Sequence, residues 1–272
     1  MVHREKILNL TSCLRRSPPI IMTTSITRAI VTGHTRGVGA ALAEQLLSRD
    51  IAVLGLSRSR NTALAQRFPQ TLEEIELDLA DPSRVAQWLA GDALRHFVDG
   101  AHSVLLLNNA GTVQPVGPIE TQDAGAIASA VGLNVATPLM LASAVAKASV
   151  TASDRRIAHI SSGAARNAYP GWSIYCATKA ALDHHARAVV LDANRALRIC
   201  SVAPGVIDTD MQAEIRGSGK EHFPLRERFE ELKRNGQLSS PEACATQLID
   251  FVLSDAFGEV PVADIRELTQ RS

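Results

Sequence analysis

The chain of 272 residues has only four cysteines, no excess of either charge and no long apolar run. Lysine and arginine together number 28, and so do aspartate and glutamate, which leaves no electrostatic footprint for nucleic acid or an anionic membrane. No apolar run approaches the roughly 20 residues that cross a bilayer. These absences predict a cytoplasmic protein with neither a nucleic-acid nor a membrane partner.

The cysteines and histidines lack the spacings of disulfide-stabilised and metal-dependent proteins. The cysteines are Cys13, Cys176, Cys200 and Cys244. They form no Cys-x-x-Cys pair and no secreted framework, so we expect reduced thiols. The histidines include the adjacent His184 and His185, which cannot share one face of a helix, and no His-Glu-x-x-His occurs. The sequence therefore indicates no metal site.

Length and composition agree with one globular domain. Hydrophobic residues make up 46% of the chain, and no low-complexity linker interrupts residues 26–272, which we assign to a single domain. Residues 1–25 fit this domain poorly. We expect them to be a disordered extension, or a mis-annotated one in which Met22 is the true start. A targeting leader is the alternative, but the segment lacks a continuous apolar core.

Short apolar, β-branched runs alternate with helical patterns along the domain. The runs predict strands near residues 28–32, 52–56, 74–77, 104–108, 156–160, 198–203 and 260–262. Strands and helices that alternate in this way form a doubly wound parallel sheet of the Rossmann type, a three-layer α/β/α domain. Ligands of such sheets bind outside the carboxyl ends of the strands.

A glycine-rich turn joins the first predicted strand to a helix predicted over residues 37–49. Its glycines allow positive φ angles and let backbone N–H groups approach a pyrophosphate, which the positive end of the helix also favours. The spacing is Gly-x-x-x-Gly-x-Gly and differs from the general Gly-x-Gly-x-x-Gly fingerprint. The residues expected to contact a dinucleotide here are Gly33, Thr35, Arg36, Gly37, Val38 and Gly39.

Tyr175 and Lys179 stand four residues apart and follow Ser162 in the chain. On a helix this spacing places a phenol and an ammonium on one face, where the cation stabilises phenolate and makes Tyr175 a proton donor near neutral pH. Reduction of a carbonyl needs such a donor. Tyrosine and lysine also fall at this spacing by chance on many helices, so the prediction depends on the motifs around them.

Five motifs occur in a fixed order along the chain. They are Thr32-Gly33-x-x-x-Gly37-x-Gly39, Asn108-Asn109-Ala110-Gly111, Ser162, Tyr175-x-x-x-Lys179 and Pro204-Gly205. By these motifs, residues 26–265 resemble the short-chain dehydrogenase/reductases. The sequence is most similar to the sepiapterin reductase-like group, especially its bacterial benzil reductases, through residues 108–120, 160–164, 169–176 and 203–212. The resemblance implies an oxidoreductase that acts on CH–OH groups or carbonyls with a nicotinamide cofactor.

The resemblance also implies catalytic roles. Tyr175 would deliver a proton to the carbonyl oxygen, which Ser162 would orient. Lys179 would contact the nicotinamide ribose and lower the pKa of Tyr175. Asn134 would hold a water molecule beside Lys179 and open a proton path to solvent. An alternative for Asn134 is a helix-kink residue that satisfies backbone groups, and both roles are compatible.

The remaining cofactor contacts follow from the same resemblance. Asn108 would flank the adenosine ribose, whereas Asn109 would tie strands together. Asp78 and Leu79 would meet the adenine, although Asp78 is also a candidate helix cap. Thr209 would hold the nicotinamide carboxamide. Further contacts are expected at Ala110, Gly111, Pro204, Gly205 and Ile207.

The end of the second predicted strand favours NADP over NAD. Where an NAD enzyme offers an acidic residue to the ribose, this chain has Ser57, so no carboxylate repels a 2′-phosphate. Arg58 follows directly and Arg36 lies in the glycine turn, so two guanidinium groups can converge on the phosphate. Each arginine alone is consistent with a solvated surface charge. Together they predict NADP, and NADP suggests reduction in the cell.

Apolar residues beside the catalytic segments are candidates for the substrate pocket. They would form a wall suited to a flat or aromatic ketone, made of Tyr169, Trp172, Met211 and Gln212. Gly163, which follows Ser162, is a further candidate substrate contact. Residues 214–235 are expected to be a mobile cover. Large apolar residues are more often core than pocket, and Trp172 is the best exception because Gly171 precedes it.

The C-terminal region differs from that of the sepiapterin reductases, and this difference bears on the substrate class. Sepiapterin reductases hold the pterin with an aspartate near the C-terminus, and Asp264 is not clearly in register with it. Vicinal diketones are therefore the expected substrates, since adjacent carbonyls activate each other toward hydride.

Three other functions stay open. A pterin, steroid, sugar or acyl-carrier ketone would use the same four catalytic residues. An extended-family epimerase or dehydratase is disfavoured by the glycine spacing and by the lack of a substantial C-terminal substrate domain. A non-catalytic NADP-sensing or scaffold protein could share the fold. Such proteins commonly lose the tyrosine or the lysine, and this chain has both.

A homodimer or homotetramer is expected, because family members often pair through long helices that here span residues 137–150 and 174–191. Their small residues, Ala142, Ala146, Ala181 and Ala188, permit close helix packing. The alternative is a monomer that buries these alanines in its own core.

Overall fold

Seven parallel strands form one sheet in the computed structural model, which describes residues 25–217 and 223–268. Their order across the sheet is β3-β2-β1-β4-β5-β6-β7. The strands are β1 (Thr27–Thr32), β2 (Ala52–Ser57), β3 (Leu72–Glu76), β4 (Ser103–Asn108), β5 (Asp154–Ile160), β6 (Leu197–Ala203) and β7 (Val262–Asp264). The predicted Rossmann-type fold is confirmed. The extension predicted at residues 1–25 lies, except for its last residue, outside the described residues.

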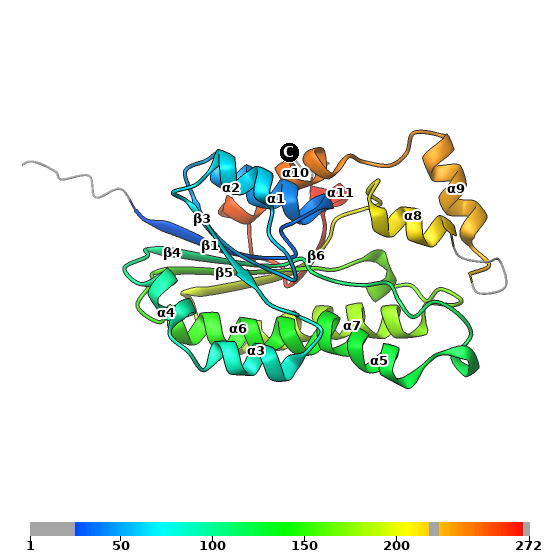
Figure 1. Ribbon diagram of the computed structural model, residues 1–272, viewed down its shortest axis with the longest axis horizontal. Coiled ribbons are helices and arrows are strands. Elements are labelled where there is room, and N and C mark those ends of the chain that lie inside the picture. The colour runs from blue at the N-terminus through cyan, green and yellow to red at the C-terminus, as the bar shows by residue number, and fades with distance from the viewer. Residues whose placement is uncertain (1–24, 218–222, 269–272) are drawn as a thin grey trace, which may run out of the picture.

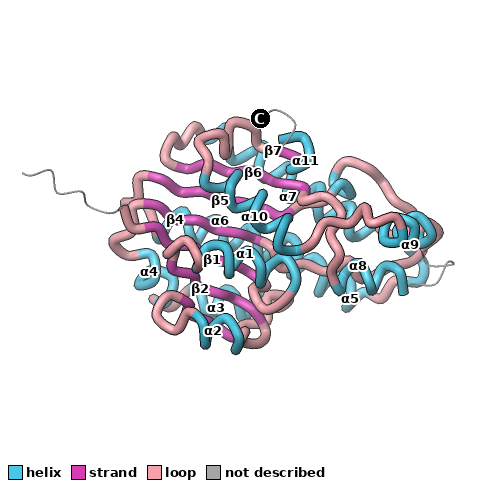
Figure 2. Tube along the Cα trace, turned by 90° about the horizontal axis from the view of Figure 1, so that it is seen from above, coloured by secondary structure: helices cyan, strands magenta, loops and turns pink. Residues whose placement is uncertain are grey.

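Helices cover both faces of the sheet and extend beyond its carboxyl edge (Figure 1, Figure 2). One face carries α1 (Gly37–Leu47), α2 (Thr62–Arg67), α10 (Pro241–Leu253) and α11 (Ile265–Leu268). The other carries α3 (Pro82–Leu89), α4 (Ala93–Val98), α5 (Ala124–Val131), α6 (Thr137–Ala148) and α7 (Ser173–Val189). Beyond the strand ends lie α8 (Asp210–Gly217) and α9 (Arg226–Arg234). The three-layer arrangement leaves the carboxyl ends of the central strands open to a ligand.

The central strands are apolar because both faces of the sheet are covered. In β4, the side chains of Leu105 and Leu107 pack with α1 and α10, whereas Val104 and Leu106 pack with α4 and α6. The edge strands match the expected positions less well. β3 begins at Leu72, and β7 spans Val262–Asp264 where residues 260–262 were expected. Edge strands are short and more polar, so their boundaries depend on pairing with a neighbour and not on an apolar pattern.

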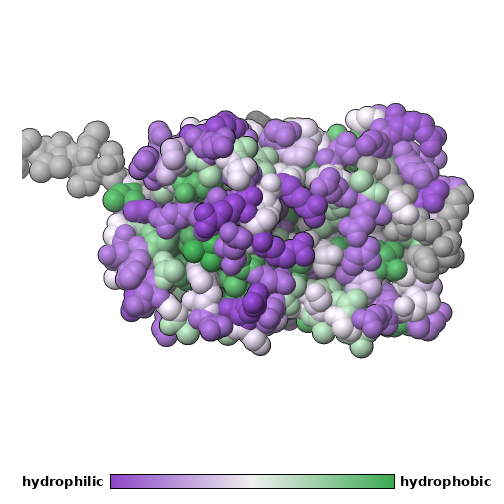
Figure 3. Space-filling view, in the orientation of Figure 1, coloured by the Kyte–Doolittle hydropathy of each residue, from purple (hydrophilic) through white to green (hydrophobic). Residues whose placement is uncertain are grey.

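One helical segment, Ala124–Ala148, is long and apolar enough to cross a membrane by length and composition. This finding differs from the expectation that no apolar run has such a length. The segment is continuous because a π-helical turn, Gly132–Ala136, joins α5 to α6. Leu141 and Val145 of the segment are buried in the core of the domain. A core helix passes the same test, so the segment is weak evidence for a membrane span. The face of the molecule drawn in Figure 3 shows a mixed polar and apolar surface.

Candidate active site

A cleft with a volume of about 1080 Å³ lies at the carboxyl ends of the strands. It begins at the glycine turn after β1, and β1 has β2 on one side and β4 on the other, which is the topological switch point of the sheet. Small-molecule pockets usually have volumes of roughly 300–1,000 Å³. The cleft therefore has room for a dinucleotide together with a small substrate.

The glycine turn fits a pyrophosphate. Gly33 and Gly37 adopt positive φ angles of 70° and 53°. A Cβ atom on Gly39 would lie 1.9 Å from the carbonyl oxygen of Gly33 and 2.5 Å from Nδ2 of Asn109. No side chain caps the first turn of α1, because Arg36 at the N-cap makes no side-chain hydrogen bond to it. Backbone N–H groups at the positive end of this helix are thus presented to the cleft, as anion binding requires.

The far end of the cleft carries the residues predicted to meet the adenosine. Ser57, Arg58, Asp78 and Leu79 all line it. The Asp78 carboxylate accepts a hydrogen bond from the N–H of Ala80 at 3.0 Å and does not cap α3. The residue that caps α3 is Asp81. Asp78 is therefore not the helix cap, and it lines the cleft.

Arg36 also lines the cleft, and its guanidinium group is paired with Asp210 of α8 at 3.1 Å. Both side chains are more than two-thirds exposed, at 72% and 75%. Exposed pairs contribute about 0–1 kcal/mol, so this pair does not prevent Arg36 from binding a phosphate. Arg58 makes no ion pair within the described residues and is exposed on the cleft.

A buried histidine supports the glycine turn from below, and sequence reasoning missed it. The His34 side chain is fully buried, and its ring fills the space where Gly55 has no side chain. Nε2 of His34 lies 2.7 Å from Oε1 of Glu74, which also accepts from the N–H of Asn61 at 2.6 Å. The network links the glycine turn to the loop that carries Arg58.

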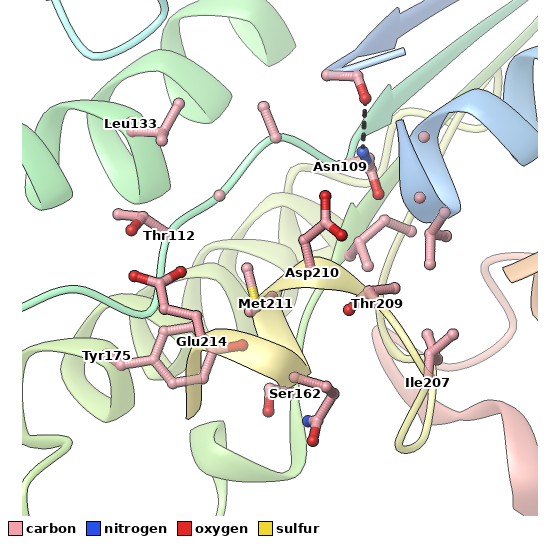
Figure 4. A pocket seen from close by; sticks show the side chains of 18 of the residues that line it. Asn109, Thr112, Leu133, Ser162, Tyr175, Ile207, Thr209, Asp210, Met211 and Glu214 are labelled. Atoms are coloured by element: carbon pink, nitrogen blue, oxygen red, sulfur yellow. Dashed lines mark hydrogen bonds between the residues drawn. The ribbon is translucent and has the colours of Figure 1, made fainter. Parts of the chain in front are cut away.

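Tyr175 and Lys179 come together with Ser162 on one wall of the cleft. Figure 4 shows the side chains of Tyr175 and Ser162. The tyrosine and lysine lie on one face of α7 and are 8% and 5% exposed. Nζ of Lys179 lies 5.7 Å from the centroid of the Tyr175 ring and donates to the carbonyl oxygen of Ile160 at 2.8 Å. Ser162 follows β5, accepts from the N–H of Ala164 at 3.1 Å, and is hydrogen-bonded to Tyr175.

Burial sets the proton affinities of this pair. It raises the pKa of Tyr175, although the hydrogen bond from Ser162 acts in the opposite direction. Burial also lowers the pKa of Lys179 to about 8, against the effect of Asp183. The expectation that the lysine would lower the Tyr175 pKa is therefore wrong for the net shift, because loss of solvent around the phenolate dominates. A raised pKa keeps the proton on Tyr175 at neutral pH, as a proton donor requires.

Asn134 does not line the cleft, and its role in holding a water molecule beside Lys179 stays a prediction. It is 1% exposed and lies in the π-helical turn between α5 and α6. Its Oδ1 accepts from the N–H of Thr112 at 2.9 Å, and its Nδ2 donates to the carbonyl oxygen of Thr112 and to Oγ1 of Thr178. The side chain thus satisfies backbone groups, which is the alternative role. A Cβ on Gly111 would lie 3.3 Å from Oδ1 of Asn134 and 3.5 Å from Nζ of Lys179, so both side chains lie close to this glycine.

Asn108 does not lie where the resemblance places it, whereas Asn109 does. The Asn108 side chain is 3% exposed, donates to the carbonyl oxygen of Pro138, and is hydrogen-bonded to His159. It points away from the cleft, because successive side chains of a strand alternate between faces. Asn109 lines the cleft instead and donates to the carbonyl oxygen of Thr32 at 3.0 Å, so it also ties strands together as expected (Figure 4).

A cluster of aromatic side chains closes the substrate end of the cleft. Trp172 is 4% exposed, stacks on Phe223 with ring centroids 4.6 Å apart, and meets Tyr175 edge-on at 5.4 Å. Phe229 of α9 completes the cluster. Trp172 therefore both lines the cleft and belongs to a buried core, so the two roles weighed for it coincide.

The predicted cover is built from α8 and α9. Met211 and Glu214 of α8 line the cleft together with Tyr175 (Figure 4). Oε1 of Glu214 accepts from Nε2 of Gln114 at 2.6 Å, which bridges α8 to the loop after β4. Residues 218–222, inside the predicted cover, lie outside the described part of the chain.

The cleft contains residues that sequence reasoning did not identify. They include Ser59, Ala80, Thr112, Gln114, Leu133, Asn167, Val206, Asp210 and Arg266. Glu214, Arg228, Phe229 and Leu232 also line the cleft, and they lie within the predicted cover. Phe229 and Leu232 could have been singled out there, because they form an apolar stripe at helical spacing in the otherwise charged sequence of α9. The polar residues offer no such pattern. Apart from Asn108, all the predicted cofactor and substrate residues line the cleft, including Gly163, Pro204, Gly205, Ile207 and Thr209.

Comparison with known proteins identifies the family. The family model described as short chain dehydrogenase matches residues 27–219. The chain belongs to the short-chain dehydrogenase/reductases. The family resemblance found in the sequence is thereby confirmed, and the chain is an oxidoreductase that uses a nicotinamide cofactor and acts on a small molecule.

Similar short-chain dehydrogenase/reductases come from several organisms. "Benzil reductase ((S)-benzoin forming)" of Bacillus cereus is 35% identical over 245 residues, which cover 88% of this chain and 98% of that protein. Sepiapterin reductase of Bos taurus is 30% identical, over 85% of this chain and 91% of the relative. A crystal structure of a short-chain dehydrogenase/reductase from Burkholderia vietnamiensis is 56% identical, with a TM-score of 0.66, over 90% of this chain and 99% of that one.

Proposed function

We propose that this short-chain dehydrogenase/reductase is an NADPH-dependent carbonyl reductase that acts on vicinal or aromatic diketones of the benzil type. The observation that carries the proposal is the meeting of Ser162, Tyr175 and Lys179 in the same cleft as the glycine turn. The aromatic cluster around Trp172 lies directly beside Tyr175 and offers an apolar surface to a flat substrate. The similarity to a benzil reductase supports the same substrate class.

The residues of the cleft divide the chemistry among them. The glycine turn, Arg58 and Thr209 would hold the nicotinamide dinucleotide, which supplies the hydride when bound. Ser162 hydrogen-bonds the substrate carbonyl oxygen and orients it. Tyr175 transfers its hydroxyl proton to that oxygen as the carbonyl becomes an alcohol. The ammonium of Lys179 stabilises the phenolate that this transfer leaves, and a proton from solvent restores the tyrosine.

The environment of Asp264 supports a diketone over a pterin. This aspartate is 5% exposed, and its carboxylate accepts three hydrogen bonds from Arg266: from the backbone N–H at 3.1 Å, from Nε at 2.9 Å and from Nη2 at 2.7 Å. Arg166 adds a contact at 3.9 Å. A carboxylate engaged in this way does not offer its oxygens to a pterin ring.

We expect kcat/KM for benzil to exceed that for sepiapterin, both with NADPH, by more than about tenfold. The reason is that the Asp264 carboxylate, held by Arg266, does not accept from pterin N–H groups, and each such group left unpaired costs about 1–3 kcal/mol. Steady-state rates with the two substrates measure this ratio. A higher kcat/KM for sepiapterin would contradict the assigned substrate class.

Replacing Arg58 by Ala is expected to weaken NADPH binding and to leave NADH binding unchanged. Hydrogen bonds to a charged group contribute about 1.5–3 kcal/mol, which corresponds to a rise in the Kd for NADPH of about ten- to a hundredfold. Fluorescence titration with each coenzyme gives both constants. Arg60→Ala is the matched control, because Arg60 is an exposed neighbour that pairs with Glu76 and does not line the cleft. Equal losses for NADPH and NADH in the Arg58 variant would contradict its role at the 2′-phosphate.

A homodimer or homotetramer formed through α6 and α7 also belongs to the proposal. Ala142 of α6 is only 3% exposed and packs in the core of its own chain, but Val150 and Leu191, just beyond the ends of α6 and α7, are 69% and 82% exposed. We expect light scattering to give at least twice the mass of one chain. The mass of one chain would contradict this assembly.

A further inference from the structure

A buried carboxylate lies one helical turn beyond Lys179. Asp183 is 1% exposed and stands on α7 four residues after the lysine, so both side chains share one face of the helix. Oδ1 of Asp183 accepts a hydrogen bond from Ser161 and another from Ser201, each at 2.7 Å. Its Oδ2 is buried and has no hydrogen-bond donor among the described residues. The carboxylate is therefore only half satisfied by hydrogen bonds.

A half-satisfied carboxylate in the core is costly unless a positive charge lies nearby. The titratable groups packed around Asp183 and Lys179 come from three elements. His185 and Tyr175 lie on α7 with them, His159 on β5 and Cys200 on β6. Burial lowers the pKa of His159 to about 3 and that of His185 below its usual value, and it raises the pKa of Cys200 to about 12. These groups are uncharged at neutral pH, which leaves Lys179 as the cation that faces Asp183.

The hydrogen bonds of Asp183 also reach the strand end that carries the catalytic serine. Ser161, which donates to Asp183, stands between two residues of the site: Ile160, whose carbonyl accepts from Nζ of Lys179, and Ser162. The backbone N–H of Ser161 donates to the carbonyl of Val202, one residue after Ser201. One carboxylate thus connects α7, β5 and β6 at the point where the catalytic groups meet.

We propose that Asp183 is a positioning residue of the active site, which acts as the fixed counter-charge of Lys179 and anchors the strand end that presents Ser162. Its carboxylate keeps the ammonium charged in a site from which water is largely removed. The ammonium in turn supports the phenolate that forms on Tyr175, so the carboxylate acts on the reaction through the lysine. This inference rests on the proposed function, because the role of Lys179 is defined by proton transfer from Tyr175.

The protonation of Lys179 can be measured without turnover. The chain contains five lysines, so lysine labelled with ¹³C at Cε gives a simple NMR spectrum of the full protein, in which Lys179→Met identifies the signal of interest. We expect Lys179 to titrate near pH 8 in the unaltered protein, in line with the pKa of about 8 that burial and Asp183 together give it. In Asp183→Asn the midpoint should fall by about one unit or more, since the opposing charge is gone.

Asp154→Asn is the matched control for the titration. Asp154 is also a largely buried carboxylate, but it lies at the opposite end of β5 and pairs with Arg156 and Arg198. The midpoint of Lys179 should be unchanged in this variant. An unchanged midpoint in Asp183→Asn, or a neutral Lys179 at neutral pH in the unaltered protein, would overturn the proposal. The second result needs no variant, so the test holds even if Asp183→Asn does not fold.

The pH profile of diketone reduction supplies a second readout. Activity should fall as pH rises through the pKa of Lys179, because the neutral amine no longer stabilises the phenolate. In Asp183→Asn this alkaline limb should move to lower pH, with activity largely recovered in mildly acidic buffer. A uniform loss of rate at every pH would indicate a purely structural role and overturn the proposal. If the unaltered protein reduces no ketone while Lys179 still titrates as expected, the proposed function fails and the counter-charge role of Asp183 stands.

Discussion

Tyr175→Phe is expected to lower kcat for diketone reduction by about a hundredfold to ten-thousandfold, the usual range for loss of a general acid. The substitution removes one hydroxyl and keeps the ring, so the edge contact with Trp172 at 5.4 Å and the approach of Lys179 at 5.7 Å are preserved. The Kd for NADPH should stay within about twofold of its value in the unaltered protein, because the substitution leaves the glycine turn intact. Stopped-flow or steady-state rates and fluorescence titration measure the two quantities separately.

The other tyrosine of the chain is the control. Tyr169 also lines the cleft and packs edge-on against Trp172 at 5.5 Å, but it lies outside the group of Ser162 and Lys179. Tyr169→Phe should change KM for the diketone more than kcat. Normal turnover of the Tyr175 variant would remove the proton donor from the mechanism.

Gly39→Ala should abolish measurable NADPH binding, with a rise in Kd of more than about a hundredfold. The new methyl group would lie 1.9 Å from the carbonyl oxygen of Gly33, which belongs to the backbone and cannot rotate away. Overpacking of this kind costs about 1–3 kcal/mol or more, and here the strain displaces the N–H groups that face the pyrophosphate. Titration with NADPH measures the loss, and thermal denaturation measures the accompanying fall in stability.

Gly91→Ala is the matched control for the same change. A Cβ on Gly91 would meet only the carbonyl oxygen of Trp88, at 3.4 Å, which is an ordinary contact, and Gly91 does not line the cleft. NADPH affinity should be unchanged in this variant. Tight NADPH binding by Gly39→Ala would show that the dinucleotide does not use the glycine turn.

The parts of the fold that follow from local pattern could be predicted from the sequence. The buried strands β1, β2, β4, β5 and β6 are apolar because helices cover both faces, and this property is visible in a run of a few residues. The glycine turn and the pairing of Tyr175 with Lys179 depend on fixed spacings within one turn or one helix, so they too were predictable.

The features that depend on packing between distant segments could not be predicted. His34 and Glu74 are 40 residues apart, and no local pattern connects them. Whether Asn108 or Asn109 faces the cleft depends on the last residue of β4, and strand ends are the least determined part of a sheet. The direction of the Tyr175 pKa depends on how completely α7 is covered, which the helix sequence alone does not specify.

Consumption of NADPH with benzil as the substrate, with NADH in parallel, tests the central claim most directly. We expect rapid oxidation of NADPH with formation of benzoin, and slower oxidation of NADH, because Ser57 and Arg58 favour a 2′-phosphate. Faster reaction with NADH would contradict the coenzyme assignment. Tight binding of NADPH without reduction of benzil or any other diketone would contradict the proposed activity.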